Sequence, residues 1–276
     1  MAGKAEHRGE AEHRGEACLS QLDLGQAAAF VSRYADRPSG PVAVVIAAYN
    51  EEASVGGVVA AVPAQLCGLG TEVIVVVDGS ADKTAQVAGE AGALVCDVPV
   101  NRGQGAALRL GYLLARRRGA EFILTTDADG QYQSEDMERV LSPLVGDEAD
   151  FVSGSRRLGS TTSTDAVRNL GVVVFAGLIS LLVRQKVTDP ACGIRAMRAK
   201  VTAEVVLDQP QYQASELMIG AVMAGFRLQE VPIEMKARRS GRTKKGGNLL
   251  YGARFSSVVI GTWWRERRRS TKTKRS

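Results

Sequence analysis

Apolar runs and amphipathic segments alternate along residues 42–126. The run at 42–48 is unbroken and rich in valine, which is typical of a strand buried on both faces. The same patterns predict further strands at 72–77, 94–98 and 121–126, and helices at 51–61, 82–91 and 104–118. Strands and helices that alternate at this spacing predict an α/β fold, with a mostly parallel sheet and helices on both of its faces.

The rest of the chain is less regular. The pattern predicts strands at 151–155 and 226–234, an apolar helix at 170–183, an amphipathic helix at 215–224 and an apolar helix at 255–264. Ahead of the core, the polar sequence AEHRGE at 5–10 recurs unchanged at 11–16, and we expect this repeat to be disordered. A helix around 18–34 and a short Pro- and Gly-containing linker follow the repeat.

Composition narrows the classes of protein. A chain of 276 residues, 45% of them hydrophobic, can bury a full core, so disorder and a disulfide-rich miniprotein are excluded. The net charge of +5 is concentrated in residues 265–276, which hold seven Lys or Arg and one Glu, and the other residues sum to −1. The body of the protein is therefore not basic, and no nucleic acid partner is expected.

Cysteine and histidine usage argues against a zinc site. The four cysteines are widely spaced, and both histidines lie in the N-terminal arm, so reduced thiols in the cytoplasm are expected. The N-terminus lacks the apolar core of a signal peptide. The uncharged stretch at 169–183 falls short of the roughly 20 residues that span a bilayer, so we expect no transmembrane segment.

Polar residues follow three of the predicted strands, as Tyr49-Asn50, Asp78-Gly79-Ser80 and Asp127-Ala128-Asp129. In an open α/β sheet, ligands bind outside the carboxyl ends of the strands, so these loops are expected to line one crevice. Neither a dinucleotide-binding glycine motif nor a P-loop follows the first strand, which argues against those two kinds of site.

Asp127 and Asp129 flank one small residue at the end of a buried strand, so both carboxylates can turn toward a single hard cation. Mg²⁺ or Mn²⁺ held by one or two carboxylates and by substrate phosphates is the usual arrangement, and Gln131 can add a neutral oxygen. The alternative for this pair alone is a solvated acidic turn.

Further segments accompany this acidic turn in a fixed order: VVIAAYNEE at 44–52, VIVVVDGSADKT at 73–84, NRGQGAALRLG at 101–111, VSGSRR at 152–157, TDPACGIR at 188–195, a stretch from SEL to EVP at 215–232, and RRSGRTK at 238–244. Together they resemble the family 2 glycosyltransferases with the GT-A fold, in the branch of the dolichol- or polyprenyl-phosphate mannose synthases. The resemblance covers residues 42–250. It implies a Rossmann-like, mostly parallel sheet with a C-terminal segment on the acceptor side.

The resemblance also implies an organisation of the chain. We expect a flexible arm with the repeat and a short helix at 1–40, a nucleotide-sugar-binding half at 41–150 and an acceptor-binding half at 151–250. An apolar helix and the basic tail would occupy 251–276.

On the donor side, the resemblance assigns the nucleotide base and ribose to Tyr49, Asn50 and Glu51, with Asp78 also facing the nucleotide. Val77 stands where the family has a first acid, which leaves GDP and UDP both open. For residues 49–51 alone, the alternative is a helix that Asn50 caps, with acids on its first turn.

The glycine-rich segment matches the family's N-R-G-K-G, which implies that Asn101, Gly103 and Gly105 approach a phosphate or sugar. Gln104 replaces the lysine of that motif. Alternatively, the two glycines only shape a turn between a strand and a helix.

Asp127, Asp129 and Gln131 match the metal and diphosphate site, with Ala128 between the acids as a donor contact. The cation there would neutralise charge on the departing nucleoside diphosphate. Asp189 and Arg195 match the family's D-x-x-x-G-x-R. Asp189 is expected either to position the acceptor or to pair with Arg195, and both interpretations remain open at this point.

In this branch the nucleophile is a lipid phosphate, an anion that needs cations to position it more than it needs a general base. Four cations match those places, although each is also consistent with a solvated surface charge: Arg156, Arg168, Arg238 and Lys244. Arginine suits a phosphate because its planar fork makes two parallel hydrogen bonds. Glu216 and Glu230 match family positions as well, or only pin a helix to a strand.

The apolar helix at 170–183 has Arg168, Arg184 and Lys186 at its ends, and Trp263-Trp264 precede the basic tail. Either segment can lie at a membrane interface, with aromatic rings and cations facing lipid headgroups. The alternative for the helix at 170–183 is burial in the core. We therefore expect a peripheral protein at the inner face of the membrane, bound to an anionic surface or to a membrane-anchored partner.

The expected activity is an inverting, metal-dependent transfer of a hexose from a nucleotide sugar to polyprenyl phosphate. Mannose from GDP-mannose is favoured, with glucose from UDP-glucose next. One alternative keeps the donor site but uses a soluble small-molecule acceptor. Another is a non-catalytic nucleotide-binding fold that its basic tail tethers to an anionic partner.

Overall fold

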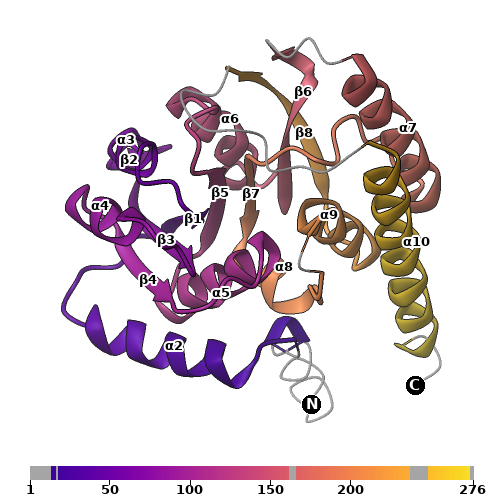
Figure 1. Ribbon diagram of the computed structural model, residues 1–276. Coiled ribbons are helices and arrows are strands. Elements are labelled where there is room, and N and C mark those ends of the chain that lie inside the picture. The colour runs from indigo at the N-terminus through magenta and orange to yellow at the C-terminus, as the bar shows by residue number, and fades with distance from the viewer. Residues whose placement is uncertain (1–13, 17, 162–165, 210, 237–247, 274–276) are drawn as a thin grey trace.

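A computed structural model describes residues 14–16, 18–161, 166–209, 211–236 and 248–273 (Figure 1). The tandem repeat falls mostly outside these ranges. In its first half, the sheet contains parallel strands β1 (Val42–Ala48), β3 (Leu69–Asp78), β4 (Leu94–Val98) and β5 (Phe122–Asp127). Only β3 is much longer than predicted, because its first residues pair with the short antiparallel strand β2 (Gln65–Leu66).

The second half of the chain extends the same sheet. Strand β7 (Arg195–Arg198) runs antiparallel to both β5 and β6 (Phe151–Thr161), and β8 (Leu228–Met235) is parallel to β6. The strand order is β2-β3-β1-β5-β7-β6-β8, with β4 also paired to β3. The predicted α/β class and the mostly parallel sheet are confirmed, and β7, which was not predicted, joins the two halves.

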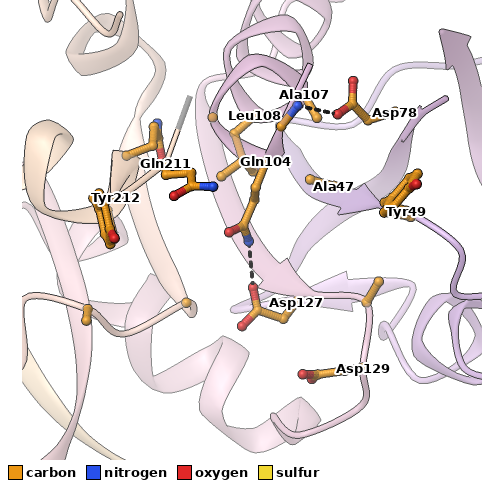
Figure 2. A pocket seen from close by; sticks show the side chains of 18 of the residues that line it. Ala47, Tyr49, Asp78, Gln104, Ala107, Leu108, Asp127, Asp129, Gln211 and Tyr212 are labelled. Carbon is orange, nitrogen blue, oxygen red and sulfur yellow. Dashed lines mark hydrogen bonds between the residues drawn. The ribbon is translucent and has the colours of Figure 1, made fainter. Parts of the chain in front are cut away.

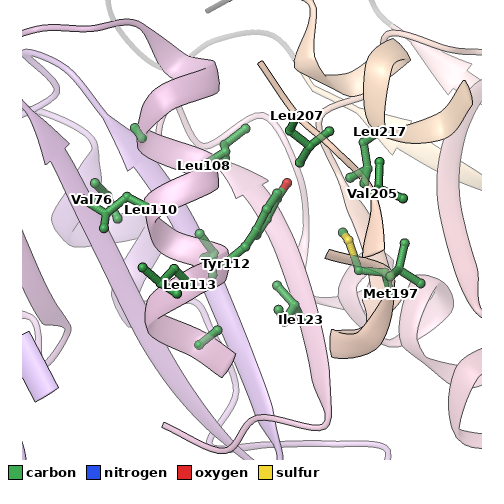
Figure 3. Packing of buried hydrophobic residues seen from close by; sticks show 14 of the residues in the cluster. Val76, Leu108, Leu110, Tyr112, Leu113, Ile123, Met197, Val205, Leu207 and Leu217 are labelled. Carbon is green, nitrogen blue, oxygen red and sulfur yellow. The ribbon is translucent and has the colours of Figure 1, made fainter. Parts of the chain in front are cut away.

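Helices cover both faces of the sheet. The first core cluster lies under α5 (Gln104–Arg117) and α2 (Gln21–Arg33), where Tyr112 and Ile123 are buried (Figure 3). The second lies under three helices on the opposite face: α3 (Val55–Ala60), α4 (Thr84–Glu90) and α6 (Ser134–Val145). Burial from both sides accounts for the unbroken apolar sequence of β1.

Close packing of α5 on the sheet requires glycine at position 111. A Cβ there would collide with the Val45 side chain of β1. This contact fixes the distance of α5 from the sheet, and hence the position of its first residue, Gln104, at the carboxyl edge.

The remaining helices gather beside β6 and β8. They are α7 (Ala166–Val183), α9 (Gln213–Met223) and α10 (Asn248–Thr273), with the short α8 (Ala199–Glu204) after β7 and a 3-10 turn, η1 (Arg14–Glu16), near α8. The α7 and α10 helices run side by side (Figure 1), with the rings of Phe175 and Phe255 4.3 Å apart. No helix within the described part of the chain is long and apolar enough to cross a membrane.

Helix α10 differs from its prediction in length. It begins before residue 255 and continues through the basic segment to Thr273, so most of that segment is helical. The indole Nε1 of Trp263 donates to the carbonyl of Leu182 at 2.9 Å, which ties α10 to the end of α7. Trp263 is therefore part of the packing, whereas Trp264 is 51% exposed.

Arg265 anchors α10 to α9. Its guanidinium lies 3.1 Å from the fully buried carboxylate of Glu216 and 2.8 Å from Asp208. Glu216 also accepts hydrogen bonds from the backbone N–H groups of Asp208 and Gln209. The basic segment thus begins with a structural ion pair, and Glu216 pins one helix to another.

Burial raises the pKa of Glu216 to about 7, with a hydrogen bond to Asp208 adding to the rise and Arg265 opposing it. The folded state therefore favours the protonated carboxyl. The stability that this proton contributes is present at low pH and is lost as the pH rises through about 7. We expect the free energy of unfolding of Glu216→Gln, measured relative to that of the wild type, to be higher at pH 8 than at pH 5 by on the order of 2 kcal/mol.

Urea unfolding at both pH values measures this difference. Glu90→Gln, the same change at an exposed position of α4, is the control and should show no pH-dependent gain. A Glu216→Gln difference that stays constant between the two pH values would contradict the assignment.

Candidate functional site

One cleft lies at the carboxyl edge of the sheet, with a volume of about 530 Å³ (Figure 2). That volume suits a small-molecule ligand. The ends of β1, β3 and β5 and the start of α5 line one side, and the loop before β7 and the starts of α9 and α10 line the other. The predicted residues that line it are Tyr49, Glu51, Asp78, Asn101, Gly103, Gly105, Asp127, Ala128, Asp129 and Arg195.

The loop after β1 is held by the loop after β3. The N–H of Asn50 donates to Ser80 Oγ, and the side-chain oxygen of Asn50 accepts from the N–H of Ala81, both at 2.9 Å. Asn50 has a left-handed φ of 52°, and α3 begins only at Val55, so Asn50 does not cap a helix. It ties two loops together, which leaves Tyr49 and Glu51 to line the cleft.

Asp78 organises the glycine-rich loop. Its Oδ2 accepts from the N–H groups of Arg102 at 2.9 Å and Gly103 at 2.7 Å, and its side chain is 2% exposed. Its buried Oδ1 makes no hydrogen bond to any part of the chain that the structure describes. Gly103 has a φ of 94°, which a side chain would strain, so it does shape the turn as well as line the cleft.

Asp127 and Asp129 carry the carboxylates at the end of β5. Asp127 Oδ1 accepts from the side-chain amide of Gln104 at 3.2 Å, so the residue that replaces the family's lysine contacts the acid without adding charge. Asp129 is 5% exposed, and its Oδ1 accepts from the N–H of Gln131 at 3.2 Å. The Gln131 amide donates to the carbonyl of Lys236, and Gln131 is not among the residues that line the cleft.

These residues fit a divalent cation of the Mg²⁺ or Mn²⁺ kind only in part. No cluster of three or more His, Cys, Asp or Glu side chains that could hold a metal occurs among the described residues. Two carboxylates in a cleft that can admit a diphosphate are nonetheless sufficient, because Mg²⁺ commonly takes its other ligands from substrate phosphates and water.

Asp189 is paired with Arg156 and not with Arg195. Its two carboxylate oxygens accept from Arg156 Nε and Nη2, each at 2.6 Å, and Asp189 is fully buried. Glu230 accepts from the N–H groups of Thr188 and Asp189, so it holds this loop against β8. Of the two open interpretations of Asp189, the pair with Arg195 is therefore wrong, and neither Asp189 nor Arg156 is among the residues that line the cleft.

The other predicted acceptor cations are not placed by the structure. Arg238 and Lys244 lie outside the described residues, and the side chain of Arg168 is not described although its backbone belongs to α7. Several lining residues escaped prediction because they belong to no motif used above: Gln211, Tyr212, Gln213, Arg254 and Phe255. The only signal for most of them was their place next to the predicted helices at 215–224 and 255–264.

Comparison with known proteins gives consistent results. The family model described as glycosyl transferase family 2 matches residues 43–206. A dolichyl-phosphate hexose transferase of Haloferax volcanii is 32% identical, over 74% of this chain and 86% of its own. A polyprenol monophosphomannose synthase of Mycolicibacterium smegmatis is 31% identical, over 82% of this chain and 88% of its own.

Among solved structures, glucosyl-3-phosphoglycerate synthase from Mycobacterium tuberculosis in complex with Mn²⁺, UDP and glucosyl-3-phosphoglycerate matches with a TM-score of 0.61. The match covers 87% of this chain and 83% of the other, at 21% sequence identity. At that identity the likeness concerns the fold, and it confirms the GT-A fold expected from the motifs.

Gly193 offers a test of the carboxylate site that leaves both acids in place. A Cβ at position 193 would collide with the Asp127 carboxylate, the mobile end of a side chain, so Gly193→Ala should displace that carboxylate and leave the fold intact. We expect at least tenfold weaker binding of Mn²⁺ with UDP, on the scale of a lost charge-assisted contact. Titration calorimetry measures the binding.

Gly57→Ala is the matched control, since a Cβ at position 57 in α3 meets no atom within 4 Å. It should bind Mn²⁺ and UDP as the wild type does. Unchanged binding by Gly193→Ala would show that the position of the Asp127 carboxylate does not matter for the ligand.

Proposed function

The chain belongs to glycosyl transferase family 2 and is a glycosyltransferase, and on that premise we propose that it transfers a hexose from a nucleotide sugar to polyprenyl phosphate with inversion at the anomeric carbon. The observation that carries this proposal is the pair of carboxylates Asp127 and Asp129, which stands between the loops after β1 and β3 and a second wall built by α9 and α10. Family membership also removes the non-catalytic interpretation.

On the donor side, Tyr49, Glu51 and Asp78 would bind the nucleoside, and the backbone at Gly103 and Gly105 would approach the phosphates. Asp127 and Asp129 would hold the divalent cation, and Gln131, which does not line the cleft, would have to turn toward it to add its side-chain oxygen. The cation supplies positive charge to the departing diphosphate. GDP-mannose is the favoured donor and UDP-glucose the next, and the replacement of the family's first acid by Val77 leaves both nucleotides open.

A phosphate acceptor needs no general base. Among the described residues that line the cleft, no histidine occurs, and Asp189 is engaged by Arg156. A phosphate oxygen is already anionic and can attack without losing a proton. Asp189 is then a positioning residue that holds Arg156 and the loop before β7.

The lipid acceptor is favoured by sequence relatives that are named for dolichyl, polyprenol and undecaprenyl phosphates. A soluble acceptor is the second candidate, because the structural neighbour is named for a phosphoglycerate product. Both acceptors present a phosphate, so transfer assays with each kind separate the two.

The α7–α10 surface supports binding to an anionic membrane. Exposed apolar side chains lie on both helices, and they are Val173, Val174, Leu181, Ile260 and Trp264. Arg267 lies over the ring of Trp263 and Arg268 over the ring of Trp264, each with its guanidinium carbon 4.9 Å from the ring centroid. Aromatic rings with cations beside them are typical of segments that lie at the lipid headgroups.

The transfer assay combines Mn²⁺, radiolabelled GDP-mannose or UDP-glucose, and either polyprenyl phosphate or phosphoglyceric acid. We expect label in the polyprenyl product, and Asp127→Asn and Asp129→Asn should each lower the rate about a hundredfold or more, because carboxylate charge is lost at nearly constant volume. Asp97→Asn, the same change at an exposed position on β4, is the control. Transfer that persists in the presence of a chelator and in both variants would contradict the assignment of a metal to Asp127 and Asp129.

Membrane binding is tested by co-sedimentation with anionic vesicles. A truncation at residue 265 would break the Arg265–Glu216 pair, so Arg267→Gln with Arg268→Gln is the better variant. Each cation near an anionic surface contributes about 1 kcal/mol, so two removed charges should weaken binding about thirtyfold at low salt and much less at high salt.

The matched control changes Arg33 and Arg37 to Gln, two exposed arginines at and beyond the end of α2. It should bind vesicles as the wild type does. If both double variants bind anionic vesicles equally weakly, the net charge of the protein determines the binding and the α7–α10 surface does not.

A further inference from the structure

Arg195 is a buried cation with no counter-ion in the described structure. It is 3% exposed, it lines the cleft, and its Nε and Nη1 atoms make no hydrogen bond to any described residue. The residues opposite it on the neighbouring strands, Thr125 and Ser153, are neutral. A buried charge without a partner is strongly destabilising, so a ligand that supplies the missing negative charge is the simplest reason for its presence.

Three partly buried arginines of the described residues are each paired with a carboxylate. Arg156 binds both oxygens of Asp189, Arg118 lies 2.8 Å from Glu72, and Arg265 lies 3.1 Å from Glu216. Arg195 makes no such ion pair within the described ranges. The difference lies in its position, since of these four it is the one that lines the cleft.

Gln213 supplies a second buried polar group in the lining of the same cleft. It is 3% exposed and lines the cleft, and its Nε2 donates to the hydroxyl of Tyr112 at 3.3 Å, while its Oε1 has no partner among the residues described. The charge of Arg195 also acts on the Tyr112 hydroxyl, whose pKa burial raises, so the phenol is neutral. The pocket wall here offers two N–H donors from a cation and one amide acceptor.

A phosphate monoester matches this set. Its anionic oxygens accept from the guanidinium fork, and the remaining P–OH of a monoprotonated phosphate can donate to Gln213 Oε1. A neutral sugar would leave the charge of Arg195 uncompensated.

The order of the strands indicates whether Arg195 faces the diphosphate of the donor or the phosphate of the acceptor. The nucleotide loops follow β3 and β1, the carboxylates end β5, and Arg195 begins β7 on the far side of β5. The departing diphosphate belongs with the carboxylates, and an inverting nucleophile must approach the anomeric carbon from the opposite side. The exposed Arg254 and the rings of Tyr212 and Phe255 line the cleft on that side, with the two rings 5.3 Å apart.

We propose that Arg195 and Gln213 bind the phosphate monoester of the acceptor, an assignment that rests on the proposed transferase function. One phosphate oxygen forms the new bond to the anomeric carbon as the bond from that carbon to the diphosphate oxygen breaks, and the electron pair leaves with the nucleoside diphosphate. No proton has to move in this step. The proton of a monoprotonated acceptor stays on the oxygen that faces Gln213.

The test measures binding of two probes, farnesyl phosphate and phosphoglyceric acid, by titration calorimetry with UDP and Mn²⁺ present. Arg195→Met should lower the affinity for the phosphate about tenfold to a hundredfold and leave UDP affinity unchanged. It should also keep or raise the melting temperature, because the change removes an unpaired buried charge. Gln213→Glu gives Arg195 an internal counter-ion, so it should weaken phosphate binding while raising the melting temperature.

Arg198→Met is the matched control. Arg198 lies on the same strand but pairs with Asp147 and Asp150 and is not among the residues that line the cleft, so its loss should lower the melting temperature and leave phosphate binding unchanged. If Arg195→Met fails to fold, Gln213→Glu carries the test. Tighter binding of farnesyl phosphate would identify a lipid acceptor, and tighter binding of phosphoglyceric acid would identify a soluble acceptor. Either result supports the phosphate subsite.

Unchanged phosphate affinity in Arg195→Met or Gln213→Glu overturns the proposal, as does a failure of the wild type to bind either probe. A loss of UDP affinity as large as the loss of phosphate affinity assigns Arg195 to the donor and also overturns it. Phosphate binding that depends on Arg195, without any sugar transfer, would instead contradict the proposed function and leave the subsite standing. Transfer to polyprenyl phosphate with an unchanged acceptor KM in Gln213→Glu would contradict the subsite and leave the proposed function standing.

Discussion

Strand β5 is hydrogen-bonded to parallel β1 on one side and to antiparallel β7 on the other, and this pairing sets the positions of the charged groups in the cleft. Parallel pairing brings the loops after β1 and β3 to the edge where β5 ends in Asp127. Because β7 runs the other way, its first residue, Arg195, pairs with Thr125, two residues before Asp127. Carboxylates and a guanidinium from distant parts of the chain thus reach one cleft.

Charge pairing separates structural residues from those that remain available to a ligand. The Arg156–Asp189 and Arg265–Glu216 pairs join loops and helices, and each guanidinium in them has a carboxyl partner within the protein. Arg195 and the Oδ1 atom of Asp78 lie buried in the same cleft without such partners in the described structure. Groups of this second kind destabilise the protein unless a ligand completes them, which is the usual relation between stability and function at a binding site.

The first half of the fold was predictable because its strands are buried on both faces, so β1, β4 and β5 appear as apolar runs in the sequence. β7 was missed because two of its four residues are arginines, and the burial of Arg195 depends on long-range pairing that no local pattern records. Helix α6 was missed as well, and Pro143 in its last turns interrupts the helical pattern.

The site was partly predictable for the same reason. Asp78, Asp127 and Asp129 lie at the ends of predicted strands and were located by position. The partner of Asp189 could not be chosen from spacing, because Asp189 binds Arg156, 33 residues away, and not the nearby Arg195. Gln213 carries no motif. It is the first residue of α9, and a hydrogen bond joins it to Tyr112 of α5.

The central claim is that two carboxylates form half of a metal site that the substrate diphosphate completes. Electron paramagnetic resonance of Mn²⁺ tests it most directly, because free Mn²⁺ can be counted with and without UDP or GDP. The account predicts weak binding of Mn²⁺ alone, much tighter binding when the nucleoside diphosphate is present, and loss of that gain in Asp127→Asn. Mn²⁺ that binds as tightly without the nucleotide, or a gain that survives Asp127→Asn, would contradict it.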